Sequence, residues 1–351
     1  MIDFRYHLVS IVAVFLALAI GIVLGSTELQ GHTLDALRAT SDSLSRQLSA
    51  ARAQSGSYQT QANAEDQFLQ SAEPRLLYKL LDGQNVVIVT EPGAQGSVVD
   101  ALNKAAATAN ATVIGQVALQ PKFNDISGAN QSSLDSINSS IATSDGVVLT
   151  TGSDPQTVYQ EQAAQLVATA ILDKGADSAA LTPGAAQTLL SAYAQDGYLT
   201  ITGTPTDRAT LAILVTPQSA PADGPNDPAN QVLLAITQQF ASASSATVVA
   251  GSTSGSASGS AISVLRSSSV SALVSSVDNA DTTLGQISVI EALATQLAGG
   301  KPNSYGISGA SAAGPTLPSP SASASASDSA SASSSSTSHP TATGKAGKKK
   351  T

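Results

Sequence analysis

The sequence predicts an α/β protein that is tethered to a membrane by one N-terminal transmembrane helix and carried on a coiled-coil stalk. Three observations lead to this prediction: an uncharged apolar run near the N-terminus, a following stretch with leucine at heptad spacing, and a long segment in which short apolar runs alternate with helix-like stretches. We expect a signal anchor over residues 1–27, a coiled-coil stalk over 28–73, a mostly parallel α/β domain over 74–306 and a disordered Ser/Ala-rich tail over 307–351.

The composition of the chain excludes several kinds of partner and site. Only 12% of the 351 residues are charged, about half the usual share of a soluble protein, and the formal net charge is −9. Because an acidic chain gains nothing from approaching a phosphate backbone, we expect no nucleic-acid partner. The chain has no cysteine, and Met1 is its one methionine. Disulfides, thiolate catalysis and thiolate metal sites are therefore excluded.

The N-terminal run predicts a membrane anchor. The 20 residues from Leu8 to Thr27 carry no charge, and Leu8, Phe15 and Leu24 mark its start, middle and end. A helix of that length spans about 30 Å, the thickness of a bilayer's hydrocarbon core. A cleaved signal peptide and a buried core helix are the alternatives. The run has no clear A-x-A cleavage site and no polar face, so we expect an uncleaved anchor in contact with membrane lipid.

The charges that flank the run predict its orientation. Arg5 precedes it, whereas the first basic residue after it, apart from His32, is Arg38. Positive charge favours the cytoplasmic side of a membrane. We therefore expect a single-pass protein with its N-terminus in the cytoplasm and its C-terminal domain outside the cytoplasm.

Residues 28–73 predict a self-associating helix. Small and apolar side chains alternate at steps of three and four, which is the a/d pattern of a coiled coil: Leu34, Leu37, Ser41, Leu44, Leu48, Ala51, Ser55, Tyr58 and Ala62. The seam is strongest at its four leucines, and Ser41 makes it marginal. An amphipathic helix folded back on its own domain is the alternative. A helix that directly follows an anchor has little to fold onto, so we expect a homo-oligomer.

After Pro74 the pattern becomes that of an α/β domain, because short strands alternate with helices of 10–15 residues. The expected strands are Asn85–Thr90, Thr112–Leu119, Gly146–Thr151, Tyr198–Thr202, Leu211–Thr216, Thr247–Ala250 and Ala261–Leu265. The expected helices are Ser97–Asn110, Thr157–Leu172, Pro183–Tyr193, Asn230–Ala241 and Gly285–Leu297. Strands that are apolar throughout indicate a parallel sheet buried on both faces.

The loop after the first expected strand is one candidate ligand site. Open α/β sheets bind ligands beyond the carboxyl ends of their strands. Here Glu91 is followed by Gly93 and Gly96 before a helix, and glycines at a helix N-terminus can cradle an anion. A Pro-Gly turn with Ser97 as the helix cap explains the same residues.

Asp278 and Asp281 form a second candidate site. Two carboxylates three residues apart can hold a hard cation or exchange protons. The alternative, which we favour, is a polar loop in which Asp281 caps the helix near Gly285.

Histidine placement predicts that the domain is not an enzyme of the Ser-His-Asp type. The three histidines are His7, His32 and His339, and none lies within the expected domain. We therefore expect no enzymatic activity and no evident cofactor. His32, just after the anchor, is the one soft or borderline candidate metal ligand that the chain offers outside the membrane and the tail.

Several short motifs resemble a known family. The chain opens with Asp3-Phe4-Arg5-Tyr6-His7, and its apolar run ends with residues 19–26 (AIGIVLGS). The expected domain closes with Val277-Asp278-Asn279-Ala280-Asp281, Gly285-Gln286-Ile287, Glu291-Ala292-Leu293, Gly299-Gly300 and Tyr305-Gly306. With these motifs the chain resembles the actinobacterial copper transporter family over roughly residues 1–306, and the Ser/Ala-rich tail is an extension.

The resemblance implies a role in copper export or copper homeostasis, with an outer-membrane pore in members that have a mycolate layer. Copper is expected through the resemblance only, because Cu(I) prefers thiolate and thioether ligands. A membrane barrel needs strands of about ten residues that alternate apolar and polar, whereas the expected strands are mostly shorter and apolar on both faces.

Two hypotheses from different classes follow. The first is a copper-homeostasis transport component, which rests on the resemblance. The second is a non-enzymatic envelope scaffold that oligomerises through its coiled coil and binds protein partners, such as cell-wall remodelling enzymes. The residues themselves favour the second.

Overall fold

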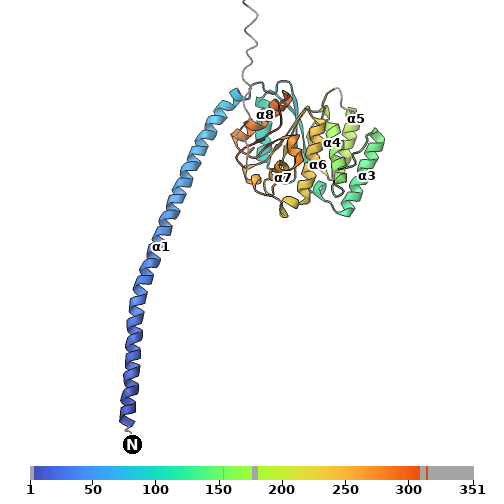
Figure 1. Ribbon diagram of the computed structural model, residues 1–351. Coiled ribbons are helices and arrows are strands. Elements are labelled where there is room, and N and C mark those ends of the chain that lie inside the picture. The colour runs from blue at the N-terminus through green and yellow to red at the C-terminus, as the bar shows by residue number, and fades with distance from the viewer. Residues whose placement is uncertain (1–3, 153, 176–180, 309–313, 315–351) are drawn as a thin grey trace, which may run out of the picture.

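A single long helix leads to an α/β domain in the computed structural model (Figure 1). The structure describes residues 4–152, 154–175, 181–308 and 314, and within these ranges the side chains of residues 4, 26–34 and 256 are not described. The predicted disordered tail over 307–351 lies almost wholly outside the described residues. The side chains of His32 and Leu34 lie outside them as well.

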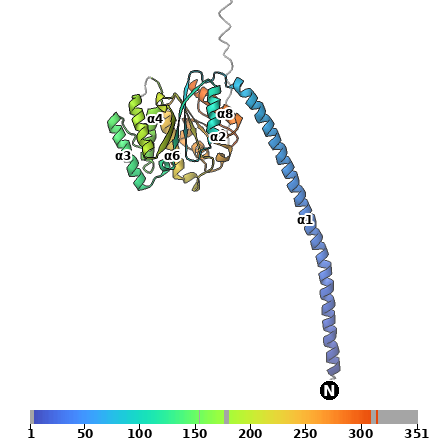
Figure 2. The same cartoon turned by 180° about the vertical axis from the view of Figure 1, so that it is seen from behind.

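Helix α1 (Phe4–Leu76) joins the predicted anchor and stalk without a break. Its 73 residues give a length of about 110 Å. Residues Arg5–Gly25 form a helix long and apolar enough to cross a membrane. Gly56 lies inside the helix and does not interrupt it, and the views from front and back show α1 extending well beyond the domain (Figures 1 and 2).

The stalk part of α1 is a solvent-exposed helix. Leu37 and Leu44 are 69% and 65% exposed. Asp35 and Arg38 form an exposed ion pair at 3.4 Å on this helix. A coiled coil formed by α1 would need the helix of a second chain, so the coiled coil stays a prediction.

The described part of the domain contains one seven-stranded sheet in the order β3-β2-β1-β4-β5-β6-β7. The strands are β1 (Asn85–Thr90), β2 (Thr112–Leu119), β3 (Leu199–Gly203), β4 (Leu211–Val215), β5 (Ala246–Ala250), β6 (Ser275–Val277) and β7 (Ser304–Tyr305). All neighbours are parallel except β2 and β3. The prediction of a mostly parallel sheet is confirmed, and the sheet is open, with β3 and β7 at its edges.

Helices cover both faces of the sheet. They are α2 (Gly96–Thr108), α3 (Gly128–Asp145), α4 (Val158–Ile171), α5 (Pro183–Gln195), α6 (Pro228–Ala243), α7 (Ala261–Ser267) and α8 (Thr283–Leu297). Helices α2 and α8 pack on one face, and α4 to α7 pack on the other with α3 outside them. Each of the five expected helices is present, whereas α3, rich in serine and asparagine, was not expected.

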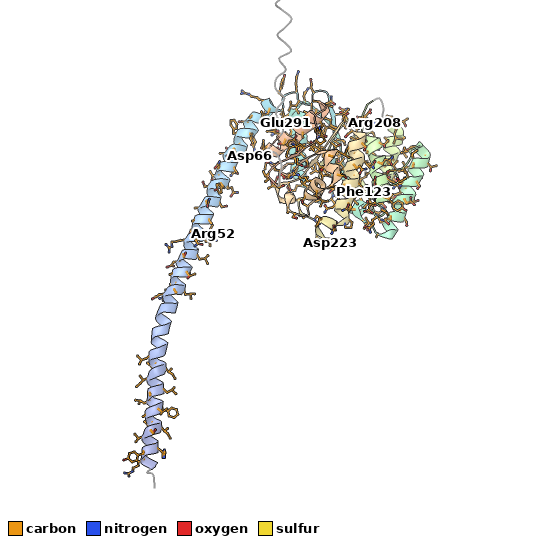
Figure 3. The ribbon with its side chains drawn as sticks, in the orientation of Figure 1. Arg52, Asp66, Phe123, Arg208, Asp223 and Glu291 are labelled. Atoms are coloured by element: carbon orange, nitrogen blue, oxygen red, sulfur yellow. The ribbon has the colours of Figure 1, made fainter. Side chains whose placement is uncertain are left out.

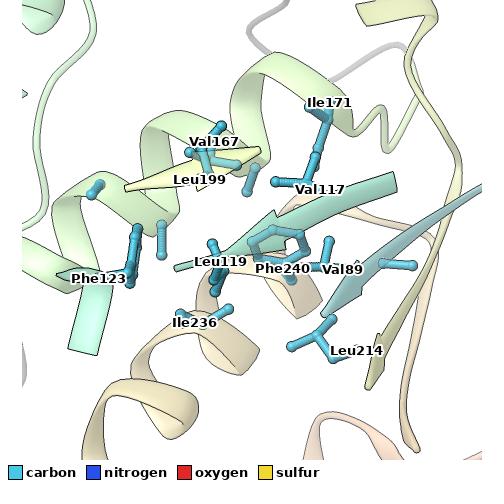
Figure 4. Close-up of a cluster of buried hydrophobic side chains, with 14 of the residues drawn as sticks. Val89, Val117, Leu119, Phe123, Val167, Ile171, Leu199, Leu214, Ile236 and Phe240 are labelled. Carbon is cyan, nitrogen blue, oxygen red and sulfur yellow. The ribbon is translucent and has the colours of Figure 1, made fainter. Parts of the chain in front are cut away.

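Alternate residues of each central strand enter opposite layers of the core. In β1, Val87 and Val89 face the layer of α4 and α6, whereas Val86 and Ile88 face the layer of α2 and α8. Figure 4 shows Val89 in the first layer, near Phe240 of α6. Burial on both faces explains why these strands are apolar throughout.

The predicted strand at Gly146–Thr151 is wrong. The segment after α3 is extended but joins no strand. Glutamine side chains of α4 satisfy its backbone instead: Gln165 accepts from the Thr150 N–H at 2.8 Å and donates to the Val148 carbonyl at 2.9 Å. Side-chain amides therefore replace the ladder that a strand would need.

The predicted strand at Ala261–Leu265 is also wrong, because these residues begin helix α7. The Ser260 side chain accepts a hydrogen bond from the Ser263 N–H at 3.3 Å and caps the helix. A Ser cap before a short apolar run marks a helix start, and the β-branched residues of the run concealed it.

The last turns of α1 pack on the domain, which corrects the expectation that the stalk has little to fold onto. Asp66 accepts a hydrogen bond from the Thr283 N–H at 3.1 Å, at the N-terminus of α8. A carboxylate there is favoured by the helix dipole. Leu69 and Ala72 are half-buried and Glu73 is buried. Figure 3 places Asp66 beside the domain and Arg52 lower on the free stalk.

Candidate functional site at the carboxyl edge of the sheet

The parallel strands bring several polar residues to one edge of the domain. Glu91 follows β1, Thr216 follows β4, and Asp278 follows β6. The chain leaves β1 toward β2 on one side and leaves β4 toward β5 on the other, so the switch point of the topology lies between β1 and β4. Ligands of open α/β sheets bind outside the strands at such a point.

Glu91 is a buried acid at this switch point. It is 5% exposed, and its Oε1 has no hydrogen-bond partner among the described residues. Its backbone is held firmly: the N–H donates to the Val215 carbonyl at 3.0 Å, and the carbonyl accepts from the Ala94 N–H at 3.0 Å. Burial raises the pKa of Glu91 to about 8. The side chain therefore holds a proton at neutral pH.

The candidate anion cradle follows Glu91 in the chain and begins with a turn at Pro92 and Gly93. Gly93 has φ +89°, and its carbonyl accepts from the Gln218 N–H at 3.1 Å, which ties the β1 loop to the β4 loop. A Cβ at Gly93 would lie 3.5 Å from the Cβ of Pro217. Gly96 is exposed and begins α2.

The Ser97 cap expected for α2 is wrong. The N-cap position is Gln95, which makes no side-chain capping bond. The start of α2 is therefore held by backbone bonds alone: the N–H groups of Val98 and Val99 donate to the Gln95 carbonyl at 3.1 and 3.3 Å.

Asp278 is fully buried and all of its contacts are within the chain. It accepts from Arg266 Nη1 at 2.7 Å, from the Ile307 N–H at 2.8 Å and from the Ser308 N–H at 3.0 Å, and it also contacts the Ser308 hydroxyl. Burial alone raises the pKa of Asp278, but the hydrogen bonds from Ser308, Ile307 and Arg266 outweigh burial and hold the pKa below its ordinary value. Asp278 is therefore a carboxylate, and its hydrogen bonds hold Ile307 and Ser308, which follow β7, in place.

Asp278 and Asp281 do not form a joint site. Asp281 is exposed and accepts from both the backbone N–H and the hydroxyl of Thr253, each at 2.8 Å. The expectation that Asp281 caps α8 is wrong, because the Thr282 hydroxyl accepts from the Gly285 N–H at 3.1 Å. Among the described residues there is no group of three or more His, Cys, Asp or Glu side chains that could hold a metal ion.

Two residues of this region were not singled out from the sequence as site residues. Arg266 of α7 donates to the Tyr305 carbonyl at 2.7 Å as well as to Asp278, and nothing local in the sequence marks contacts over such separations. Glu291 of α8 is 7% exposed, and burial raises its pKa to about 7. The sequence signal that could have identified Glu291 is an acidic residue in the middle of an apolar helix face.

At this edge Glu91 is a buried acid with a raised pKa, and Asp278 is a carboxylate paired with Arg266. A long apolar helix, an exposed helical stalk and an α/β domain with helices on both faces of a mostly parallel sheet define a membrane-anchored protein with a doubly wound domain. The chain belongs to the family described as "Copper transport outer membrane protein, MctB", whose family model matches residues 1–315.

Curated relatives carry the name "Copper transporter MctB". The protein from Mycobacterium tuberculosis (strain ATCC 25618 / H37Rv) is 32% identical over 316 residues, which cover 87% of this chain and 96% of the relative. The protein from Mycobacterium leprae (strain TN) is 32% identical over 325 residues, which cover 91% of this chain and all of the relative. The similarity therefore includes the anchor, the stalk and the domain together.

Proposed function

We propose that this chain serves in copper export or copper homeostasis as a membrane-anchored component. The observation that carries the proposal is the match to the copper transport family over residues 1–315, which includes the apolar helix as well as the domain. Copper is the cargo of such a system. A tight copper site within the chain is not required for this role.

We propose further that the chain crosses the membrane once, with Arg5 on the cytoplasmic side and the domain outside the cytoplasm. The apolar stretch of α1 ends at Gly25, and Asp66 docks on α8 about 60 Å further along the helix. The stalk would hold the domain well clear of the bilayer surface.

Deletion of the chain tests the copper role. Cells that lack it should accumulate more copper under copper stress than cells that carry it, measured by mass spectrometry of washed cells. The full chain should restore the lower copper level, and the His32→Ala chain should restore it equally. Equal copper with and without the chain would remove the copper proposal.

Protease accessibility tests the topology. External protease should remove the domain from spheroplasts while the apolar helix stays in the membrane after a carbonate wash. Full protection of the domain, or recovery of a chain that starts near Ser26, would overturn the orientation or the anchor.

The second candidate function is a non-enzymatic envelope scaffold that self-associates through the stalk and binds protein partners, such as cell-wall remodelling enzymes. It is favoured by the ligand chemistry, because Cu(I) prefers thiolate and thioether groups and the chain has no cysteine and one methionine, Met1. A scaffold predicts altered cell-wall turnover in the deletion strain at unchanged copper. A transport component predicts raised cell copper in the deletion strain at unchanged cell-wall turnover.

A further inference from the structure

One heptad register runs along α1 from the membrane span into the stalk. Leu16 and Leu44 are four heptads apart, as are Ile20 and Leu48, so both pairs take equivalent positions on a supercoiled helix. We define the heptad stripe as seven of the side chains at the a and d positions of this register: Leu16, Ile20, Leu37, Leu44, Leu48, Ala51 and Tyr58. Polar residues take four of the other a and d positions: Thr27, Gln30, Ser41 and Ser55.

We propose that the heptad stripe packs against the same stripe of a second copy of this chain, in parallel and in one register, from within the membrane span to about Tyr58. This inference rests on the self-association proposed above. It adds the orientation, the extent and the end point of the contact.

The stripe is open along both parts of the helix. In the span, Leu16 and Ile20 are 61% and 51% exposed, and they line a shallow apolar hollow on the helix surface. In the stalk, Leu48 and Tyr58 are 48% and 63% exposed. Lipid covers the first part in a membrane, but the second part faces water, where exposed leucine is costly.

The end of the stripe is already an interface. Leu69, Ala72 and Leu76 continue the same a and d positions, and all three are half-buried against the domain. Asp66, just before them, and Glu73, among them, take e positions, and Asp66 accepts a hydrogen bond from the Thr283 N–H of α8. The chain's own domain therefore occupies the stripe from Asp66 onward, and a second helix can use it only below that point.

A second copy fits the open part better than an unrelated helix does. A copy anchored in the same bilayer places Leu16 opposite Leu16 and Leu44 opposite Leu44 at equal heights, and it must run parallel. The flanking positions also agree: a parallel pair sets Gln47 near Arg52 of the second copy, with no like charges opposed.

Cysteine cross-linking in membranes tests the proposal directly, because the chain has no cysteine of its own. Two matched pairs of single substitutions in the full chain compare the stripe with the opposite face. Ala51→Cys lies on the stripe and Ala53→Cys, equally exposed, lies away from it. Leu16→Cys and Leu18→Cys form the same comparison within the span. Each membrane preparation is oxidised with iodine and the products are sized.

The proposal expects a product of twice the chain mass from Ala51→Cys and Leu16→Cys, at least tenfold more than from Ala53→Cys and Leu18→Cys. Leu69→Cys should give little of this product, because Leu69 is half-buried close to the contact between Asp66 and α8. Equal yields within both pairs, or a product of another mass, would overturn the proposal. So would cross-linking at Leu69→Cys as strong as at Ala51→Cys.

The span offers one competing face, which the same method separates. Gly21 and Gly25 form a G-x-x-x-G spacing, the pattern of close helix pairs in membranes. A Gly21→Cys chain that cross-links while Leu16→Cys does not would overturn the single register. Cell copper measured on the same strains reports the copper proposal separately, since absent cross-linking with a normal copper level refutes the pairing alone.

Discussion

Replacing Glu91 by glutamine removes a buried proton-binding group from the carboxyl edge of the sheet. Its pKa rises from 4.5 to about 8 because the side chain is buried. The folded chain therefore keeps a proton that the unfolded chain has lost, between pH 4.5 and about 8. Stability is highest below pH 4.5 and falls as pH rises through the folded pKa. At about 1.4 kcal/mol per unit, the loss approaches about 5 kcal/mol above pH 8.

Urea unfolding of wild type and Glu91→Gln at pH 5, 7 and 9 measures this loss. The stability of Glu91→Gln relative to wild type should increase with pH by several kcal/mol, since glutamine has no proton to lose. Glu65→Gln makes the same chemical change at an exposed stalk position and serves as the control. A difference between Glu91→Gln and wild type that stays constant from pH 5 to 9 would refute the assignment of Glu91 as a buried protonated acid.

Three further predictions concern the same edge and its helices. Asp278→Asn should destabilise the domain by about 3 to 5 kcal/mol in urea, because it leaves the Arg266 charge without its buried partner; a loss below about 1 kcal/mol would contradict a stabilising role of the Arg266–Asp278 ion pair. Glu291→Gln should gain up to about 3 kcal/mol over wild type at pH 9 but little at pH 5, since its pKa is raised to about 7. Thr282→Ala should cost about 1 kcal/mol through loss of the α8 cap, whereas Ser97→Ala, which removes no cap, should cost little; equal losses would contradict the capping assignments.

The central strands and most helices could be predicted because their signals are local. The apolar runs that became β1 and β4 are bounded by turn residues, and burial on both faces explains their apolar character. Ala261–Leu265 was misread because a short apolar run suits a strand or a helix equally, and the Ser260 cap decides between them. Helix α3 was missed because most of its residues are polar. It is held partly by Asn138, which accepts from the buried Tyr193 hydroxyl at 2.6 Å.

The sequence indicated which residues lie in the loops after the strands, but not how their side chains are buried or paired. The rule that ligands bind beyond strand ends drew attention to Glu91, and the spacing of two carboxylates drew attention to Asp278 and Asp281. Glu91 follows β1 and Asp278 follows β6. Their environments depend on distant partners that a single sequence does not reveal. Asp278 is paired with Arg266 and accepts hydrogen bonds from Ser308. Glu91 is buried, and the loop that follows it is joined to the β4 loop through Gly93 and Gln218.

We propose that this chain lowers cell copper only while it is anchored in the membrane. Cell copper is therefore to be compared in a deletion strain that carries either the full chain or a chain whose helix Arg5–Gly25 is replaced by a cleaved signal sequence. Immunoblotting confirms equal amounts of the two chains outside the cytoplasm. The full chain should restore the lower copper level, and the released chain should leave copper as high as in the deletion strain. Equal restoration by the released chain would contradict the need for the anchor, and failure of both would contradict the copper role.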